Sequence, residues 1–212
     1  MEYSAVIVAA GKGTRMQLGY NKVYYKIDGQ PILETTMDIF LNDPDCKQIV
    51  VVTNSDDYHK SVSEGTTGKV VIAKGGETRQ ESVTNGLEAV ICDYVFIHDG
   101  ARPFLAKESL EHLKEAMEVE DAACLMVPCK DTIKRVEGDY IVQTIPRQEL
   151  RAAQTPQCFK TELIRTCMAQ ANEEGFLGTD DCMLVERYSD VRIRVVEGTF
   201  ENKKITTPDD LK

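Results

Sequence analysis

The chain has 212 residues, which is enough for one sizeable hydrophobic core and short for two, so we expect a single domain over residues 1–212. Its formal net charge of −10 argues against a nucleic-acid partner, because binding to a phosphate backbone requires clustered lysine and arginine. A small nucleotide needs only a local cationic pocket and remains compatible with this charge.

The cysteines and the hydropathy pattern indicate the cellular compartment in which the protein is expected. Seven cysteines form no C-x-x-C pair and three histidines are scattered, which argues against a zinc site and favours free thiols in a reducing, cytoplasmic compartment. No apolar run approaches membrane-spanning length, and the N-terminus has no charged-then-apolar signal pattern. We therefore expect no membrane association.

The first predicted element is a buried strand at residues 4–8, and it leads into the glycine-rich stretch A-A-G-K-G-T-R-M at residues 9–16. Glycine has no Cβ, so consecutive N–H groups can point into one concave nest that binds an anion. Arg15 and Lys22 add positive charge where the loop ends. We interpret this loop as a phosphate-binding site; a tight strand-to-helix turn without a ligand is the alternative.

This loop differs from the two commonest phosphate motifs. It begins like a dinucleotide fingerprint, but Met16 stands where a third glycine is needed, and no Walker string is present. Its pattern instead resembles the signature of sugar-phosphate and polyol-phosphate nucleotidyltransferases, which implies a loop wrapped around the triphosphate of CTP or another NTP.

Strand and helix patterns alternate along most of the chain, which predicts an α/β fold with a mostly parallel sheet flanked by helices. The predicted strands lie at residues 4–8, 48–53, 69–73, 94–97, 122–127 and 192–197. The predicted helices lie at residues 31–41, 56–63, from the polar run after residue 76 through 91, 107–119, 161–172 and from 179–181 to 188, with a last one beginning near residue 205. Thr161 is predicted to cap its helix.

Two stretches after predicted strands carry further polar groups. Gly75 and Gly76 would let the backbone lie against a flat ring, with backbone amides and Ser82 hydrogen-bonding a base edge. An ordinary turn with Thr78 as a helix N-cap is the alternative.

The stretch H-D-G-A-R-P at residues 98–103 follows the fourth predicted strand. Ligands of open parallel sheets gather at the carboxyl ends of strands, so Asp99 should lie beside the first loop. A carboxylate beside a triphosphate needs a bridging cation, and Mg²⁺ takes one or two carboxylates together with substrate phosphates. Gly100 and Ala101 would keep the entrance open, and Arg102 would pair with phosphate or with Asp99. A purely structural Asp99–Arg102 ion pair is the alternative.

Residues 131–135 and 140–145 alternate polar and apolar around Gly138, which predicts a hairpin. An isolated hairpin is marginal in water, so this excursion, at about 130–147, needs a partner surface. We expect a projecting β-arm that packs on a second subunit; folding back onto its own domain is the alternative.

The order of the motifs resembles the family of 2-C-methyl-D-erythritol 4-phosphate cytidylyltransferases. The matching stretches are A-A-G-K-G-T-R-M, Lys22, G-G-E-T-R-Q-E-S-V, H-D-G-A-R-P, D-T-I-K-R, T-P-Q and E-N-K-K-I-T-T-P-D-D-L. The resemblance implies a Rossmann-like fold whose β-arm interlocks a homodimer. It also implies transfer of CMP from CTP to methylerythritol phosphate with Mg²⁺, in the non-mevalonate isoprenoid pathway.

The resemblance also implies roles for individual residues. Contacts to CTP would come from Ala9, Ala10, Gly11 and Gly13 at the phosphates, and from Gly76, Ser82, Gly100 and Ala101 at cytosine. Asp99 would bind magnesium, and Arg15 and Lys22 would stabilise the transition state. The acceptor would be positioned by Arg147, Lys204, Arg102, Thr155, Thr179 and Thr132 of the partner arm.

Two departures from the family pattern stand out. The family usually has P-K-Q before its tyrosine, whereas this chain has Asn21-Lys22-Val23-Tyr24, which predicts a looser loop around the lysine. The chain also stops earlier than the family pattern, so we expect it to lack a terminal helix of that pattern.

Three rival functions stay open. A ribitol-5-phosphate cytidylyltransferase has the same chemistry, but its relatives tend to have glycine in place of Ala10, and serine and valine in place of Gly100 and Ala101. A non-catalytic nucleotide-binding module would bind CTP without turnover. A dinucleotide-dependent oxidoreductase would bind NAD.

Overall fold

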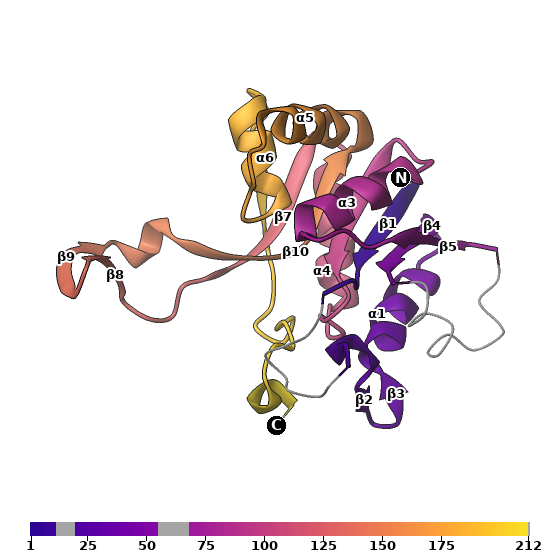
Figure 1. The fold of residues 1–212 in the computed structure, drawn as a ribbon, viewed down its shortest axis with the longest axis horizontal. Coiled ribbons are helices and arrows are strands. Elements are labelled where there is room, and N and C mark those ends of the chain that lie inside the picture. Colours follow the sequence, from indigo (N-terminus) through magenta and orange to yellow (C-terminus); the bar gives the residue numbers. More distant parts are fainter. Residues whose placement is uncertain (12–19, 55–67, 212) are drawn as a thin grey trace.

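A seven-stranded sheet forms the centre of the computed structural model, which describes residues 1–11, 20–54 and 68–211 (Figure 1). The strands of this sheet are β1 (Tyr3–Val8), β4 (Cys46–Thr53), β5 (Val70–Lys74), β6 (Tyr94–Asp99), β7 (Ala122–Pro128), β10 (Arg151–Lys160) and β11 (Arg194–Glu197). The strand order is β11-β7-β10-β6-β1-β4-β5, and β10 alone among these strands runs antiparallel to its neighbours. The predicted mostly parallel sheet is therefore confirmed.

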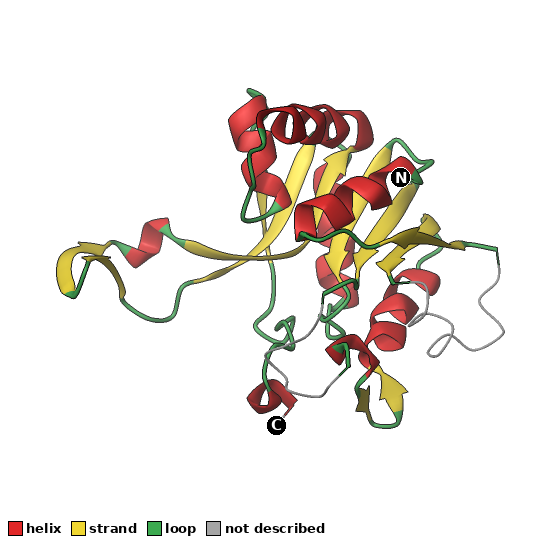
Figure 2. Cartoon of the chain, in the orientation of Figure 1, coloured by secondary structure: helices red, strands yellow, loops and turns green. Residues whose placement is uncertain are grey.

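Helices cover both faces of the sheet (Figure 2), which explains why β1 is apolar at nearly every position. The helices are α1 (Ile32–Leu41), α3 (Arg79–Glu88), α4 (Lys107–Met117), α5 (Thr161–Glu174) and α6 (Asp181–Tyr188). Alternate side chains of a strand point to opposite faces. Tyr3, Ala5 and Ile7 pack with α1 and α4, whereas Val6 packs with α3, α5 and α6.

Short elements complete the part of the chain that the structure describes. The turns η2 (Lys22–Tyr24), η3 (Arg147–Glu149) and η4 (Pro208–Leu211) are 3-10 helices, and β2 (Lys26–Ile27) pairs with β3 (Gln30–Pro31). None of the described helices is long and apolar enough to span a membrane. The helix predicted at residues 56–63 lies outside the described residues.

Several helix boundaries and caps differ from the prediction. Helix α3 ends at Glu88 instead of residue 91, because the Gln48 side chain from β4 donates to the Ala89 carbonyl and accepts from the Ile91 N–H. Helix α4 ends two residues earlier than predicted, at Met117. Thr161 begins α5 but does not cap it; its hydroxyl donates to the Cys92 carbonyl, and Lys160 holds the cap position.

Strand β10 is the strand of the central sheet that the sequence pattern did not predict. A proline removes a ladder donor and argues against a central strand, yet Pro156 lies inside β10 between β6 and β7. The pairing with β7 shifts register between Ala153 and Gln157, so the strand passes the proline with an irregularity. This strand brings Thr155 to the level of Asp99.

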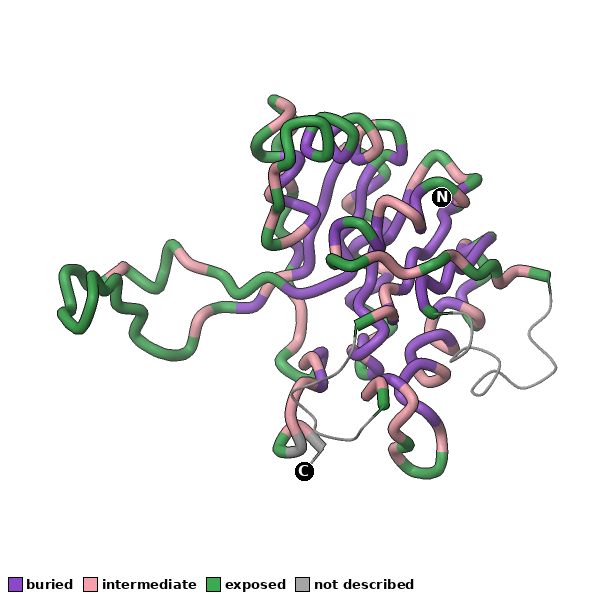
Figure 3. Tube along the Cα trace, viewed as in Figure 1, coloured by how far each residue is buried: buried purple, intermediate pink, exposed green. Residues whose placement is uncertain are grey.

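The segment between β7 and β10 leaves the body of the molecule as a hairpin of β8 (Ile133–Glu137) and β9 (Tyr140–Ile145) (Figure 1). Gly138 makes its turn with a positive φ of 57°. Nearly all of this hairpin is exposed, as the tube coloured by burial makes plain (Figure 3). Tyr140 and Ile141, at 79% and 66% exposed, are apolar side chains that its own domain does not cover.

Candidate active site

Two cavities open side by side at the carboxyl edge of the sheet. The first, of about 410 Å³, is lined by Val8, Ala9, Ala10, Gly11, Asn21, Lys22, Val23, Gly76, Glu77, Thr78, Arg79, Ser82, Asp99, Ala101, Lys204 and Thr206. The second, of about 270 Å³, is lined by Arg79, Asp99, Arg102, Ala153, Gln154, Thr155, Gln157, Thr179, Asp180 and Lys204. Arg79, Asp99 and Lys204 line both, so the two cavities meet at one carboxylate and two cations.

The glycine-rich loop begins where β1 ends, at the wall of the first cavity. The Ala9 N–H donates to the Val52 carbonyl at 2.8 Å, which ties the loop to β4. Gly75 from the second glycine stretch lies against Ala10, where a Cβ on Gly75 would collide with the Ala10 Cβ. Gly75 thus allows two segments far apart in sequence to form one wall. Gly13 and Arg15 lie outside the described residues.

The second glycine stretch is held by the start of α3. The Gly76 N–H donates to the Ser82 hydroxyl oxygen at 3.0 Å, and that hydroxyl donates to the Thr78 carbonyl at 2.9 Å. Thr78 also caps α3 by accepting from the Glu81 N–H, so the cap proposed as an alternative is present in the structure. The cap and the cavity wall coexist, because the Thr78 hydroxyl caps α3 while the Thr78 carbonyl and the Ser82 hydroxyl hold Gly76 in place.

The Asp99 carboxylate lies at the junction of the cavities with three cationic side chains around it. Lys204 Nζ is 2.9 Å and Arg102 Nε 3.4 Å from Oδ2, and Arg79 Nε is 3.5 Å from Oδ1. Burial alone would raise the pKa of this carboxyl, but Arg79, Lys204 and Arg102 hold it well below its usual range. Asp99 is therefore ionised at neutral pH, and the Asp99–Arg102 pair that the sequence suggested is one of three contacts.

The side chains at this junction can be compared with the ligands that a divalent metal ion requires. Among residues 1–11, 20–54 and 68–211, no group of three His, Cys, Asp or Glu side chains is arranged to hold an ion. Of the described carboxylates, Asp99 is the one that lines both cavities, and its Oδ1 has a long contact, 3.5 Å, with Arg79 Nε. Mg²⁺ commonly takes one carboxylate and fills its other positions with phosphate oxygens and water. The residues present fit that mode and do not fit an all-protein metal cage.

Arg79 is a site residue to which the sequence analysis assigned no role. Its NH1 and NH2 groups donate to both oxygens of Asp181 at 2.9 and 2.7 Å, and its Nε faces Asp99. The bidentate pair ties the start of α3 to the start of α6. The sequence did contain a sign of this role. Arg79 is the first residue of α3, where the helix dipole disfavours a cation, so an arginine there is expected to pair with nearby carboxylates.

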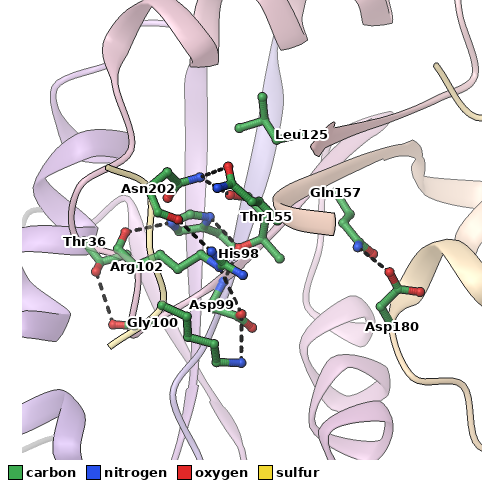
Figure 4. Close-up of polar contacts among 12 residues, drawn as sticks. Thr36, His98, Asp99, Gly100, Arg102, Leu125, Thr155, Gln157, Asp180 and Asn202 are labelled. Carbon is green, nitrogen blue, oxygen red and sulfur yellow. Dashed lines mark hydrogen bonds and ion pairs between the residues drawn. The ribbon is translucent and has the colours of Figure 1, made fainter. Parts of the chain in front are cut away.

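A fully buried histidine supports the Asp99 backbone (Figure 4). His98 Nε2 lies 3.1 Å from the Arg102 carbonyl, which can only accept, so Nε2 carries the proton. His98 Nδ1 then accepts from the Thr155 hydroxyl at 3.0 Å, and the same hydroxyl oxygen accepts from the Asp99 N–H at 3.0 Å. Burial lowers the pKa of His98 from 6.5 to about 4, so the ring is neutral.

Asn202 joins the C-terminal segment to the same cluster. Its Nδ2 donates to the Thr155 carbonyl at 2.9 Å and to Gln154 Oε1 at 3.2 Å, and its carbonyl accepts from Arg102 NH1 at 2.6 Å. These bonds place Lys204, two residues further on, next to Asp99. Figure 4 shows Asn202, Thr155 and Arg102 converging from three separate segments.

The T-P-Q stretch anchors the start of α6. Gln157 Oε1 accepts from the N–H groups of Asp181 and Cys182, and its Nε2 donates to Asp180 Oδ2 (Figure 4). Asp180 is the N-cap, with Oδ1 accepting from the Met183 N–H at 3.0 Å, which agrees with the predicted helix start. Thr179, just before this cap, is exposed at the rim of the second cavity.

Most of the residues singled out from the sequence come together at these two cavities. The first cavity gathers Ala9, Ala10, Gly11, Lys22, Gly76, Ser82, Asp99, Ala101 and Lys204; the second adds Arg102, Thr155 and Thr179. Gly100 lines neither, since its Cα faces Val8, Ala9 and Leu33. Thr132 and Arg147 lie exposed on the hairpin segment and line neither cavity of their own chain.

Comparisons with known proteins agree along the chain. The family model described as 2-C-methyl-D-erythritol 4-phosphate cytidylyltransferase matches residues 3–212. A protein of that name from Caldanaerobacter subterraneus is 46% identical over 220 residues, covering 100% of this chain and 96% of the relative. One from Halalkalibacterium halodurans is 44% identical over 216 residues, covering 100% and 94%.

Solved structures also resemble this chain. The crystal structure of 2-C-methyl-D-erythritol 4-phosphate cytidylyltransferase from Thermus thermophilus has a TM-score of 0.82 at 33% identity, covering 100% of this chain and 96% of that one. The structure of 4-diphosphocytidyl-2C-methyl-D-erythritolsynthase from Anaerococcus prevotii has a TM-score of 0.88 at 31% identity, covering 99% and 95%.

The neutral His98 predicts a pH dependence of stability. Its pKa of about 4 in the folded state lies below the value of 6.5 for an unperturbed ring, so the unfolded chain binds more protons between those pH values. The stabilisation is complete above pH 6.5 and is lost as pH falls toward 4, by roughly 3 kcal/mol. Urea unfolding of His98→Gln without nucleotide or divalent metal should show a flatter slope across this window. The exposed His112→Gln variant should keep the wild-type slope, and an unchanged slope in His98→Gln would contradict the assignment.

Proposed function

This chain belongs to the 2-C-methyl-D-erythritol 4-phosphate cytidylyltransferase family, and we propose that its two joined cavities are where it transfers CMP from CTP to 2-C-methyl-D-erythritol 4-phosphate. The reaction releases pyrophosphate and gives 4-diphosphocytidyl-2-C-methyl-D-erythritol, for isoprenoid biosynthesis by the non-mevalonate route. One observation supports this assignment most directly: Asp99, Arg79 and Lys204 line both cavities, so a ligand in each cavity would meet the other at these three side chains.

The first cavity is the proposed CTP site. Ala9, Ala10, Gly11 and Gly13 would surround the triphosphate, because a loop of small residues lets N–H groups approach phosphate closely. Gly76, Ser82 and Ala101 would bind cytosine, whereas Gly100, expected from the sequence to join them, lines neither cavity. The Ser82 hydroxyl proton is donated to the Thr78 carbonyl, so this hydroxyl is suited to accept a hydrogen bond from an amino group such as that of cytosine.

The second cavity is the proposed acceptor site, with Lys204 and Arg102 as cations for the acceptor phosphate. Thr179 is exposed at its rim, with its hydroxyl donating to Met183 Sδ at 3.5 Å. Thr155 also lines this cavity. Its hydroxyl proton is donated to His98 Nδ1, so toward the acceptor this hydroxyl would act only as a hydrogen-bond acceptor. Thr132 and Arg147 would come from the arm of a second subunit.

The proposed chemistry brings two anions together in line. The acceptor phosphate oxygen attacks the α-phosphorus of CTP, and the bond to pyrophosphate breaks on the opposite side. Arg15 and Lys22 would stabilise the charge that develops, since preorganised cations do this without reorganisation. Asp99 would hold Mg²⁺, which supplies charge neutralisation on the triphosphate as a Lewis acid. A general base is unnecessary because a phosphate monoester dianion is already nucleophilic.

The hairpin supports a homodimer, and the thiols support a reducing cytoplasm. An isolated hairpin is marginal in water, and β8 and β9 are exposed in the single chain. A second subunit would cover their apolar side chains. All seven cysteines are free thiols, as expected in a reducing compartment.

The function is tested by pyrophosphate release from CTP with each acceptor. We expect turnover with methylerythritol phosphate and Mg²⁺, at most weak turnover with ribitol 5-phosphate, and loss of turnover with EDTA that added Mg²⁺ restores. Faster turnover with ribitol 5-phosphate would favour the rival enzyme, CTP binding without turnover would favour a sensing module, and NAD binding would favour an oxidoreductase.

Removing either proposed transition-state cation should slow the reaction strongly. Lys22→Ala and Arg15→Ala should each lower kcat by a hundredfold or more, roughly the loss seen when one oxyanion donor is removed. The matched control is Lys26→Ala, four residues along and exposed, which should retain wild-type turnover. Near-normal turnover in both site variants would remove them from the mechanism.

The arm is tested by mixing two inactive variants. If Arg147 acts in the partner's site, subunits carrying Lys22→Ala and Arg147→Ala should recover roughly a quarter of wild-type activity after exchange, since one site of each mixed dimer is intact. Mixing Lys22→Ala with Arg15→Ala should recover nothing, because both residues would serve the same subunit's site. Failure of the first mixture, with mixed dimers verified by mass spectrometry, would refute a shared site.

A further inference from the structure

Lys22 lies on a very short element, the three-residue turn η2 at the mouth of the first cavity. A lysine side chain is long and flexible, so where its ammonium group can reach depends on how firmly its backbone is held. On the C-terminal side the turn is anchored well. Val23 is buried in the core, and the Tyr24 hydroxyl lies 2.9 Å from the Thr53 hydroxyl at the end of β4.

On the N-terminal side, where the described residues resume at residue 20, the side chain of Asn21 anchors the turn. Its Nδ2 donates to the Ala9 carbonyl at 2.6 Å, and its Oδ1 accepts from the Val23 N–H at 3.3 Å. The Asn21 carbonyl also accepts from the Tyr24 N–H at 3.1 Å, which closes the turn. Both ends of the amide group are therefore engaged with protein, and the group bridges η2 to the root of the glycine-rich loop.

The residue at the other end of this bridge is itself fixed to the sheet. The Ala9 N–H donates to the Val52 carbonyl at 2.8 Å, and Ala9 is buried. The Asn21 amide therefore makes the backbone of Lys22 part of the same rigid body as the start of the loop proposed to hold phosphate. The backbone of Asn21 needs no unusual conformation for this, with φ −65° and ψ 125°.

We propose that Asn21 is the positioning residue for Lys22, and that its bond to the Ala9 carbonyl sets the approach of the lysine ammonium to the nucleotide phosphates. This inference rests on the proposed function, in which Lys22 contacts CTP. The sequence predicted a looser loop around Lys22, because Asn21 replaces the proline of the family pattern. In the structure, the Asn21 side chain instead holds the turn through two hydrogen bonds.

The test compares Asn21→Ala, Lys22→Ala and the double variant in CTP-dependent pyrophosphate release. A misplacement of about 1 Å can cost a hundredfold, so Asn21→Ala should lower kcat/KM for CTP by roughly ten- to a hundredfold. The KM for the acceptor should stay unchanged. In the Lys22→Ala background, Asn21→Ala should cost less than about twofold more, because residues acting as a unit are non-additive.

Two further variants separate positioning from folding. Gln48→Ala removes a side-chain amide of the same kind, whose Nε2 donates to the Ala89 carbonyl and whose Oε1 accepts from the Ile91 N–H; Gln48 lines neither cavity, so this variant should keep wild-type kinetics. Asn21→Ser keeps a hydroxyl next to Val23 but cannot reach Ala9, so it should lose as much activity as Asn21→Ala. Unfolding midpoints of all variants are measured in parallel.

Four outcomes would overturn the inference. Wild-type kinetics in Asn21→Ser would show that the Ala9 bond is not needed, and fully multiplicative losses in the double variant would show that Asn21 acts independently of Lys22. Normal turnover in Lys22→Ala itself would remove the proposed role of that lysine and the positioning role with it. Loss in Lys22→Ala with wild-type kinetics in Asn21→Ala would overturn the positioning role alone.

Discussion

One carboxylate ties the site together, because Asp99 faces three cations that come from three different parts of the chain. Arg79 begins α3, Arg102 follows β6, and Lys204 comes from the segment after β11. Burying a charged group costs free energy unless it is paired with an opposite charge. The three cations therefore stabilise the buried Asp99 carboxylate, and the carboxylate in turn stabilises their positions. The same arrangement gathers positive charge at the place where the two cavities meet, which is where an enzyme joining two phosphates needs it.

Behind this charged layer lies a neutral one. His98, Thr155 and Asn202 are buried and connect Asp99, Arg102 and the C-terminal segment through hydrogen bonds without adding charge. A charged group there would compete with the Asp99 pairs, whereas a neutral imidazole acts as a donor at one nitrogen and an acceptor at the other. The arrangement orients the cations by backbone and side-chain contacts that do not depend on the presence of a ligand.

The two cavities also differ in how they are supported. The first is built on strand ends and a helix cap, with the glycine-rich loop held by β4 and the turn of Lys22 held by Asn21. The second depends on β10, the C-terminal segment and the start of α6, which Arg79 and Gln157 tie to the sheet. The exposed hairpin leaves the molecule between β7 and β10, and β10 contributes Ala153, Gln154, Thr155 and Gln157 to the wall of the second cavity.

What the sequence alone determined is local. Apolar runs and glycine-rich turns identified most strands, and the rule that ligands gather at carboxyl strand ends placed Ala9 and Asp99 at one edge, because these signals depend on neighbours in the chain. The tertiary structure alone decided what depends on distant partners. Arg79 acquires its role from Asp181, 102 positions away, β10 passes Pro156 through a register shift, and Asn21 finds the Ala9 carbonyl, since no local pattern encodes which chain segment lies opposite.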